Sequence, residues 1–120
     1  MPYRIAFASA DGANIDRHFG AADSFLIIEV EPDGSYRETE RRPARPPCRH
    51  GSHDEPAMQE AADALSDCLY VAAEAIGPGA QRALERAGVL PLEVQDITIA
   101  DAVKQIHKYE LNKRRASVSY

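Results

Sequence analysis

The sequence lacks a long hydrophobic run and an excess of positive charge. No apolar stretch approaches the roughly 18 residues of a membrane-spanning helix, so we expect a soluble protein without a membrane partner. Lys and Arg together number 14 against 19 Asp and Glu, which gives a formal net charge of −5. Because non-specific nucleic-acid binding depends on an excess of Lys and Arg, this charge argues against a nucleic-acid partner.

Several catalytic and redox motifs are absent as well. The sequence has no phosphate-binding P-loop, no Cys-x-x-Cys pair and no Gly-x-Ser-x-Gly nucleophile elbow. A two-metal nuclease would need carboxylates clustered on its sheet. The first expected strand contains none; Asp11 lies just beyond it, and Glu74 follows the fourth expected strand. These absences favour a binding protein over an enzyme.

Cysteine is scarce, with only Cys48 and Cys68 present. The N-terminus begins with a strand-like pattern at Tyr3–Ala8 and not with a basic region before an apolar helix. We therefore expect no export signal and a cytoplasmic protein, in which both thiols stay reduced. Cys68 opens a buried strand and is expected to be an inert core residue. His107 flanks the apolar stripe of the last helix and is expected at its boundary.

The length and the hydrophobic pattern predict one domain. With 120 residues, 44% of them hydrophobic, the chain fits a single domain over residues 1–120, with a core at about 3–112 and a short C-terminal tail. Apolar runs bounded by turn residues predict four buried strands, and a polar run after Pro32–Gly34 predicts an edge strand. The five strands are expected at residues 3–8, 25–30, 36–42, 68–73 and 89–94.

Three amphipathic helices are expected between and after the later strands. Apolar residues recur at intervals of three and four from Met58 to Leu65, from Ala80 to Ala87 and from Ile99 to Ile106. Thr98 and Asp101 form a start similar to a capping box for the last helix. The order is therefore β-β-β-α-β-α-β-α.

This order constrains the topology. Strand–helix–strand crossovers imply parallel pairing in the second half, and the hairpin forces an antiparallel strand in the first half. We therefore expect an α/β fold with a five-stranded mixed sheet and helices on both faces. That arrangement is the ribonuclease H-like layout.

The densest cluster of candidate metal ligands lies in an expected loop, Cys48-Arg49-His50-Gly51-Ser52-His53-Asp54. Thiolate and imidazole are the donors that zinc and iron sites prefer. Cys48, His50 and His53 are too few for a closed structural zinc site, but they suit an open or shared one. The same residues also fit an exposed polar loop that happens to contain histidines.

A further candidate, His18, follows the first expected strand in the segment Asp16-Arg17-His18-Phe19-Gly20. In open α/β sheets, ligands gather beyond the carboxyl ends of the strands, where this loop should lie. Phe19 is expected to pack inward, and Gly20 gives the backbone room to turn or to approach a ligand. His18 alone also fits a surface or capping histidine.

The segment Gly77-Pro78-Gly79-Ala80 joins an expected strand to an expected helix. Free backbone N–H groups at a helix start can hold an anion or a cluster sulfide. A tight turn without any ligand fits the same residues, so the sequence leaves both interpretations open.

The chain resembles the dinitrogenase iron–molybdenum cofactor biosynthesis family over roughly residues 3–107. The resemblance rests on the following elements: Ile5-Ala6-Phe7-Ala8-Ser9-Ala10-Asp11-Gly12, Ile15-Asp16-Arg17-His18-Phe19-Gly20, Phe25, Leu65-Ser66-Asp67-Cys68, Ile76-Gly77-Pro78-Gly79-Ala80, Leu84 and Gly88. It implies a ribonuclease H-like fold and an accessory protein that binds nitrogenase cofactors or their iron–sulfur precursors and passes them on.

The resemblance also bears on individual residues. The histidine of the family's His-Phe-Gly motif, which is implicated in cofactor binding, corresponds to His18. The Cys48-x-His50-x-x-His53 loop resembles a subset of members and is expected to supply further ligands. Some members form the C-terminal part of a radical enzyme that builds the precursor cluster. This chain lacks the cysteine-rich motif of that enzyme, so we expect no radical chemistry from it.

Together these observations predict a non-enzymatic carrier of an iron–sulfur cluster or an iron–molybdenum cofactor precursor, with zinc as a substitute metal. Its expected partners are cofactor donor and acceptor proteins, and the sequence leaves the oligomeric state open. The expected cofactor-binding residues are His18, Phe19, Gly20, Gly77 and Gly79. The expected metal ligands are His18, Cys48, His50 and His53.

Two alternatives from other functional classes remain open at this point. The first is a metal-dependent hydrolase that uses Asp11, Glu74 and a loop histidine. The second is an interaction or regulatory domain in which the histidines bind no metal.

Overall fold

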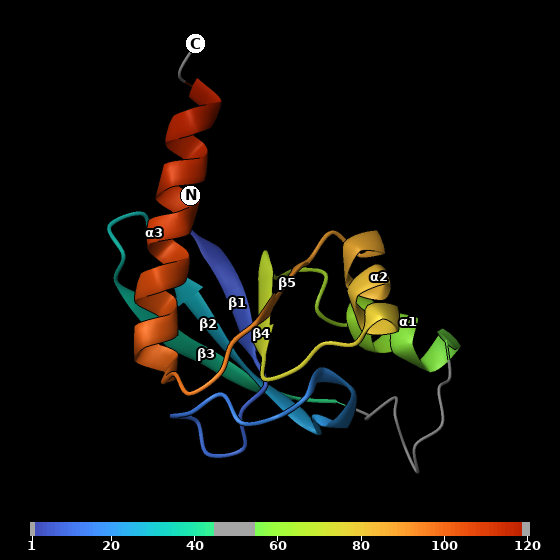
Figure 1. Ribbon diagram of the computed structural model, residues 1–120. Helices are drawn as coiled ribbons and strands as arrows, with labels where there is room; N and C mark the ends of the chain where they lie inside the picture. The colour runs from blue at the N-terminus through green and yellow to red at the C-terminus, as the bar shows by residue number, and fades with distance from the viewer. Residues whose placement is uncertain (1, 45–54, 119–120) are drawn as a thin grey trace.

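A computed structural model describes residues 2–44 and 55–118, and Figure 1 shows the order of the elements. These residues contain the five strands and the three α-helices that the sequence predicts, together with one short 3-10 helix. In chain order the elements are β1 (Tyr3–Phe7), η1 (Phe19–Ala21), β2 (Ser24–Val30), β3 (Tyr36–Pro43), α1 (Glu55–Asp63), β4 (Tyr70–Ala73), α2 (Pro78–Arg86), β5 (Leu90–Glu93) and α3 (Ile99–Val118).

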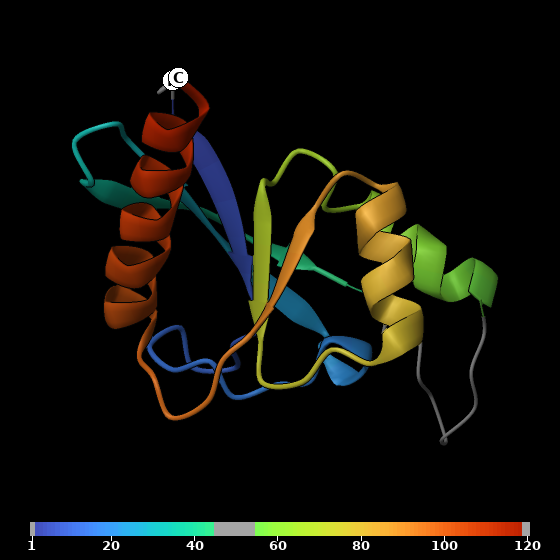
Figure 2. The ribbon, with the colours of Figure 1, turned by 45° about the horizontal axis from the view of Figure 1, so that its top comes forward.

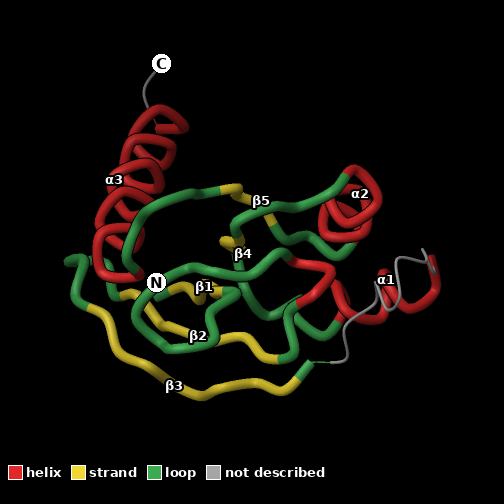
Figure 3. Tube along the Cα trace, turned by 60° about the horizontal axis from the view of Figure 1, so that its bottom comes forward, coloured by secondary structure: helices red, strands yellow, loops and turns green. Residues whose placement is uncertain are grey.

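The strands form one mixed sheet in the order β3-β2-β1-β4-β5, which Figure 3 shows from one edge to the other. The β1–β2 and β2–β3 pairs are antiparallel, whereas β4 pairs parallel with both β1 and β5. The polar strand β3 lies at an edge, as expected. The α/β fold with a five-stranded mixed sheet is therefore confirmed. The finer ribonuclease H-like assignment stays a prediction.

Helices cover both faces of the sheet, with α3 on one side and α1 and α2 on the other (Figure 2). Because successive side chains of a strand point to opposite faces, each strand contributes to two hydrophobic cores, one on each face of the sheet. In β1, Ile5 and Phe7 belong to the cluster that includes Val103 of α3. Ala6 and Ala8 belong to the cluster beneath α1 and α2. The prediction of helices on both faces is confirmed.

The hairpin turn between β2 and β3 follows its sequence signature. Gly34 has a φ angle of +91°, in the left-handed region that glycine adopts without strain. The carboxylate of Asp33 accepts hydrogen bonds from the backbone N–H and the hydroxyl of Ser35, at 2.9 and 2.6 Å. These bonds close the turn and bring it beside α3, where a Cβ on Gly34 would lie 3.1 Å from the His107 ring.

The helix α3 begins as the sequence predicts. The hydroxyl of Thr98 accepts a hydrogen bond from the backbone N–H of Asp101 at 3.1 Å, which caps the first turn. Neither α3 nor any other helix in residues 2–44 and 55–118 is both long and apolar enough to cross a membrane.

Two of the expected strands begin later than their apolar runs. The backbone N–H of Cys68 donates to the carbonyl of Leu65 in the turn after α1, at 2.9 Å. The N–H of Val89 donates to the carbonyl of Leu84 at the end of α2, also at 2.9 Å. An N–H group that closes a helix end cannot also donate to a ladder of strands. The strands β4 and β5 therefore occupy 70–73 and 90–93 instead of 68–73 and 89–94.

The structure agrees with the prediction for Cys68 and differs from the prediction for His107. Cys68 is buried, and burial raises the pKa of its thiol to about 12, which fits the expected inert core residue. The expectation that His107 lies at a boundary is wrong, because its side chain is buried. Its ring nitrogens lie 2.9 Å from the Tyr3 hydroxyl and 3.2 Å from the Pro32 carbonyl. Helical periodicity could not show that β1 and the hairpin turn cover this position.

An ion cluster joins β1, β3 and the turn after α1. The carboxylate of Asp67 accepts hydrogen bonds from Arg42 at 2.8 and 2.9 Å and from Arg4 at 3.0 Å. The hydrogen bonds from Arg42 outweigh the opposing effect of burial and hold the pKa of Asp67 at about 2, below its ordinary value of 3.8.

We expect this cluster to contribute to stability at neutral pH and to lose that contribution in acid. Because the pKa of Asp67 is lower in the folded chain, its contribution is complete above about pH 4 and declines as the pH falls toward about 2. Asp67→Asn should therefore lower the melting temperature at neutral pH, and the difference from wild type should shrink in acid. A difference that stays constant over this pH range would contradict the role given to Asp67.

Candidate functional site

The carboxyl ends of β1, β3, β4 and β5 lie at one end of the sheet, the lower end in Figure 1. The loop after β1, which carries His18, leaves from this end. The turn after β4, which leads through Gly77 into α2, also leaves from it. The structure therefore brings both of these expected site segments to the same end of the sheet, where ligands of open α/β sheets bind.

The first part of the loop is stabilised by Asp11. Its carboxylate accepts hydrogen bonds from the backbone N–H groups of Ala13 and Asn14, each at 2.8 Å, and from the Ser9 hydroxyl at 3.3 Å. These bonds, that from the Asn14 N–H foremost, hold the pKa of Asp11 well below its ordinary range. The carboxylate is therefore engaged in a turn, which gives no support to the hydrolase alternative.

His18 and Glu74 face each other across a short parallel bridge of backbone. The N–H of Phe19 donates to the carbonyl of Ala75, and the N–H of Glu74 donates to the carbonyl of Arg17, both at 2.9 Å. The Nε2 atom of His18 then lies 3.4 Å from the Oε1 atom of Glu74. Both side chains stay accessible, with exposed fractions of 62% and 42%.

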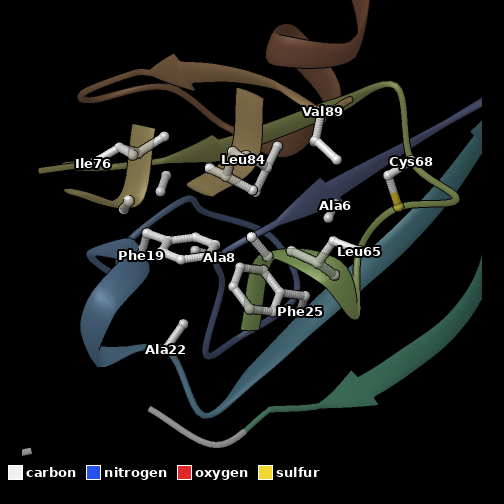
Figure 4. Packing of buried hydrophobic residues seen from close by; sticks show 14 of the residues in the cluster. Ala6, Ala8, Phe19, Ala22, Phe25, Leu65, Cys68, Ile76, Leu84 and Val89 are labelled. Carbon is white, nitrogen blue, oxygen red and sulfur yellow. The ribbon is translucent and has the colours of Figure 1, made fainter. Parts of the chain in front are cut away.

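Phe19 and Gly20 follow directly in η1. The Phe19 side chain is only 1% exposed and packs against Phe25, with the ring centroids 5.6 Å apart (Figure 4). The expectation that Phe19 packs inward is confirmed. It is therefore placed to hold the backbone of His18 in position, and Gly20 is partly exposed in the same turn.

The start of α2 offers backbone N–H groups at the same end of the sheet. Gly77 precedes the helix, and Pro78, its first residue, has no N–H group. The N–H of Gln81 makes the first helical bond, to the Gly77 carbonyl at 2.9 Å. Among the described residues no side chain caps this terminus, which leaves the N–H groups of the first turn to water or a ligand.

Gly77 is required neither by the backbone nor by packing. Its φ angle of −66° is open to any residue, and a Cβ at this position would meet no atom within 4 Å. The neighbouring Ile76 is fixed instead, since its N–H donates to the carboxylate of Glu93 at 2.7 Å. The missing side chain at Gly77 therefore leaves open space at a rigidly held helix start.

Cys48, His50 and His53 lie outside the described residues, so their part in the site stays a prediction. The described chain resumes at Glu55, the first residue of α1. On the other side, Ala44 follows β3 and donates its N–H to the carbonyl of Asp23 at 2.9 Å. Ala44, the last described residue before the gap, therefore lies at the same end of the sheet as His18.

The described residues offer few groups that could bind a ligand at this end of the sheet. Within residues 2–44 and 55–118, no group of three or more His, Cys, Asp or Glu side chains is placed to hold a metal ion. These residues instead combine an exposed imidazole with an uncapped helix start. An imidazole nitrogen can bind a metal ion, and the N–H groups of a helix start can bind an anionic group.

Sequence reasoning missed the pairing of His18 with Glu74. It placed Glu74 only in the hydrolase alternative, although the position of Glu74 directly after a buried strand was a usable signal. The sequence does not show that these two loops pair side by side, because their pairing depends on the backbone bridge between His18 and Ala75.

Comparison with known proteins identifies the family of this chain. Residues 1–109 match the family described as dinitrogenase iron-molybdenum cofactor. Protein NifX from Rhodobacter capsulatus is 31% identical over 113 residues, covering 92% of this chain and 71% of that protein. Protein NifX from Klebsiella pneumoniae is 32% identical over 111 residues, covering 92% and 69%. The FeMo cofactor biosynthesis protein NifB from Frankia alni is 34% identical over 105 residues, and this chain spans only 20% of its length.

Solved structures share the fold. The crystal structure of PH0822 has a TM-score of 0.63 at 18% identity, covering 88% of this chain and 90% of that one. The apo form of the orange protein from Desulfovibrio gigas has a TM-score of 0.58 at 22% identity, covering 88% of each chain. These likenesses concern the fold alone. The family match over residues 1–109, together with the NifX relatives, shows that this chain belongs to the dinitrogenase iron–molybdenum cofactor family.

Proposed function

We propose that this protein acts in iron–molybdenum cofactor biosynthesis as a non-enzymatic carrier of an iron–sulfur cluster or a cofactor precursor. Membership of the family and the NifX and NifB relatives support a role in this biosynthesis. The observation that carries the proposal is the placement of the exposed His18 imidazole and the uncapped start of α2 at one end of the sheet.

The proposed binding uses two kinds of contact. His18 donates a nitrogen lone pair to an exposed iron atom of the cargo, since neutral imidazole is a good ligand for iron. The backbone N–H groups at the start of α2 offset the negative charge of the cluster. We propose Cys48, His50 and His53 as further ligands, with zinc able to take the place of iron there. A ligand set that leaves iron positions open allows transfer to an acceptor.

The partners in this proposal are the proteins that donate the cluster and accept it, and the place of action is the cytoplasm. A carrier of this kind is loaded and unloaded by contact with other proteins, so its own affinity for the cargo should be moderate.

Gly77→Asp is expected to have opposite effects on stability and on cargo binding. An aspartate before α2 caps the free N–H groups and complements the helix dipole, which should raise the free energy of unfolding by about 0.5 kcal/mol. The same carboxylate occupies the N–H groups and repels an anionic cluster, so iron retention should fall. Urea unfolding and iron analysis after anaerobic loading with iron and sulfide measure the two effects.

Gly34→Ala is the matched control for that substitution. At Gly34 the φ angle is +91° and a Cβ would lie 3.1 Å from the His107 ring, so alanine should lower stability by about 1–2 kcal/mol. The hairpin turn follows β2, at the end of the sheet opposite to His18, so iron retention should stay at the wild-type level. Unchanged retention in Gly77→Asp would contradict the proposed role of the start of α2.

A further inference from the structure

We infer that Glu74 is a positioning residue for His18: it faces Nε2 of the imidazole and leaves Nδ1 as the nitrogen that binds the iron of the cargo. The inference rests on the proposed carrier function and goes beyond it, because it names the ligating atom and the residue that selects it.

The first step is the geometry of the pair. Nε2 of His18 lies 3.4 Å from Oε1 of Glu74, closer than a water-separated pair. A carboxylate offers only acceptor oxygens, so this contact favours a proton on the nitrogen that faces it. Neutral imidazole has one protonated nitrogen, and its lone pair is then on Nδ1. The two nitrogens point to different sides of the ring, so Nδ1 is directed away from Glu74.

The second step is the rigidity of the backbone that carries both residues. The two hydrogen bonds of the bridge, at 2.9 Å each, fix the separation of the two segments. The side chain that follows each bridge segment is buried, Phe19 on one side and Ile76 on the other. The imidazole and the carboxylate therefore meet on two anchored segments, although both side chains are accessible from solvent.

The third step is the balance of charge. A carboxylate near an anionic cluster is unfavourable by itself, so Glu74 helps only through the imidazole that it orients. Carboxylates that hold the second nitrogen of a ligating histidine fix its tautomer and raise its basicity, and their loss weakens metal binding about 10- to 100-fold. Glu74 should therefore strengthen binding when His18 is present and should not when His18 is absent.

The experiment combines nuclear magnetic resonance of the unloaded protein with loading by iron and sulfide. In 15N-labelled wild type at alkaline pH, we expect the neutral ring to carry its proton on Nε2 in a larger share of molecules than free histidine does. Glu74→Ala should shift the ring toward the tautomer mixture of free histidine and lower the affinity for the cluster about 10-fold or more. Glu74→Gln, whose amide oxygen still accepts a hydrogen bond, should keep the tautomer and most of the affinity.

The background of His18→Ala provides the internal control. In that background Glu74→Ala should cause no further loss of iron, whereas an equal loss in both backgrounds would overturn the inference. In loaded wild type, labelling only Nδ1 of histidine with 15N should change the nitrogen coupling in the pulsed electron paramagnetic resonance spectrum of the reduced cluster. A coupling that does not respond to this label would also overturn it.

The experiments distinguish a failure of the proposed carrier function from a failure of the role given to Glu74. Wild type that takes up no cluster would overturn the carrier function, and the tautomer of His18 would still decide whether Glu74 orients the ring. Wild type that binds the cluster through His18, with tautomer and affinity unchanged in Glu74→Ala, would overturn only the role of Glu74. Thermal unfolding of each variant confirms that the accessible Glu74 has been replaced without loss of the fold.

Discussion

Replacing Phe19 by alanine is expected to lower the free energy of unfolding by about 3–5 kcal/mol. The side chain is almost completely buried and packs against Phe25 in the core beneath α1 and α2. Its removal takes apolar surface out of the core and leaves a cavity that the rigid sheet cannot close. Urea unfolding of the variant and the wild type measures the loss.

His18→Ala, one residue earlier, is the matched control. The His18 side chain is 62% exposed, so its removal should change the free energy of unfolding by no more than about 0.5 kcal/mol. Both variants should lose cargo, His18→Ala because the ligand is gone and Phe19→Ala because its backbone is no longer anchored. Equal stability of the two variants would contradict the division between an anchoring Phe19 and a ligating His18.

Tyr70→Phe is expected to lower the free energy of unfolding by about 1.5–3 kcal/mol at neutral pH. Tyr70 is fully buried in β4, and its hydroxyl donates a hydrogen bond to the carboxylate of Glu110 in α3. Burial acts to raise the pKa of Glu110, but hydrogen bonds from Tyr70 and Arg114 outweigh it and leave that pKa below its ordinary value. The variant leaves a buried charge with one donor fewer.

The cost of Tyr70→Phe should decrease in acid. Because the folded pKa of Glu110 is lower than its unfolded value, its stabilisation is complete above the ordinary glutamate pKa of 4.5 and declines as the pH falls through the folded pKa. Tyr3→Phe is the control, since the Tyr3 hydroxyl contacts the ring of His107 rather than a carboxylate. It should cost about 1 kcal/mol. A larger cost for Tyr3→Phe than for Tyr70→Phe at neutral pH would contradict the importance of the buried charge.

The sheet could be predicted from sequence because its signals are local. Apolar runs mark the four buried strands, and the polar run after the Pro32–Gly34 turn marks the edge strand β3. The hairpin and the two helical crossovers then determine which pairs are antiparallel and which are parallel. The starts of β4 and β5 were placed two residues and one residue too early, at Cys68 and Val89, where a helix end takes the N–H group.

The site could be predicted only in outline. The rule that ligands gather at the carboxyl ends of strands correctly brought His18 and Gly77 to one end of the sheet. The approach of Glu74 to His18 and the burial of His107 depend on how segments far apart in the chain pack side by side. No periodic pattern in the sequence indicates which distant segments will pack together.

The most direct test of the carrier function is anaerobic reconstitution with iron and sulfide, followed by removal of free iron, metal analysis and visible absorption. Wild type should keep an iron–sulfur chromophore. His18→Ala, with an unchanged melting temperature, should keep about a tenth of it or less. Colourless wild-type protein, or a His18→Ala variant that keeps as much iron and sulfide as wild type, would contradict the proposed function of this end of the sheet.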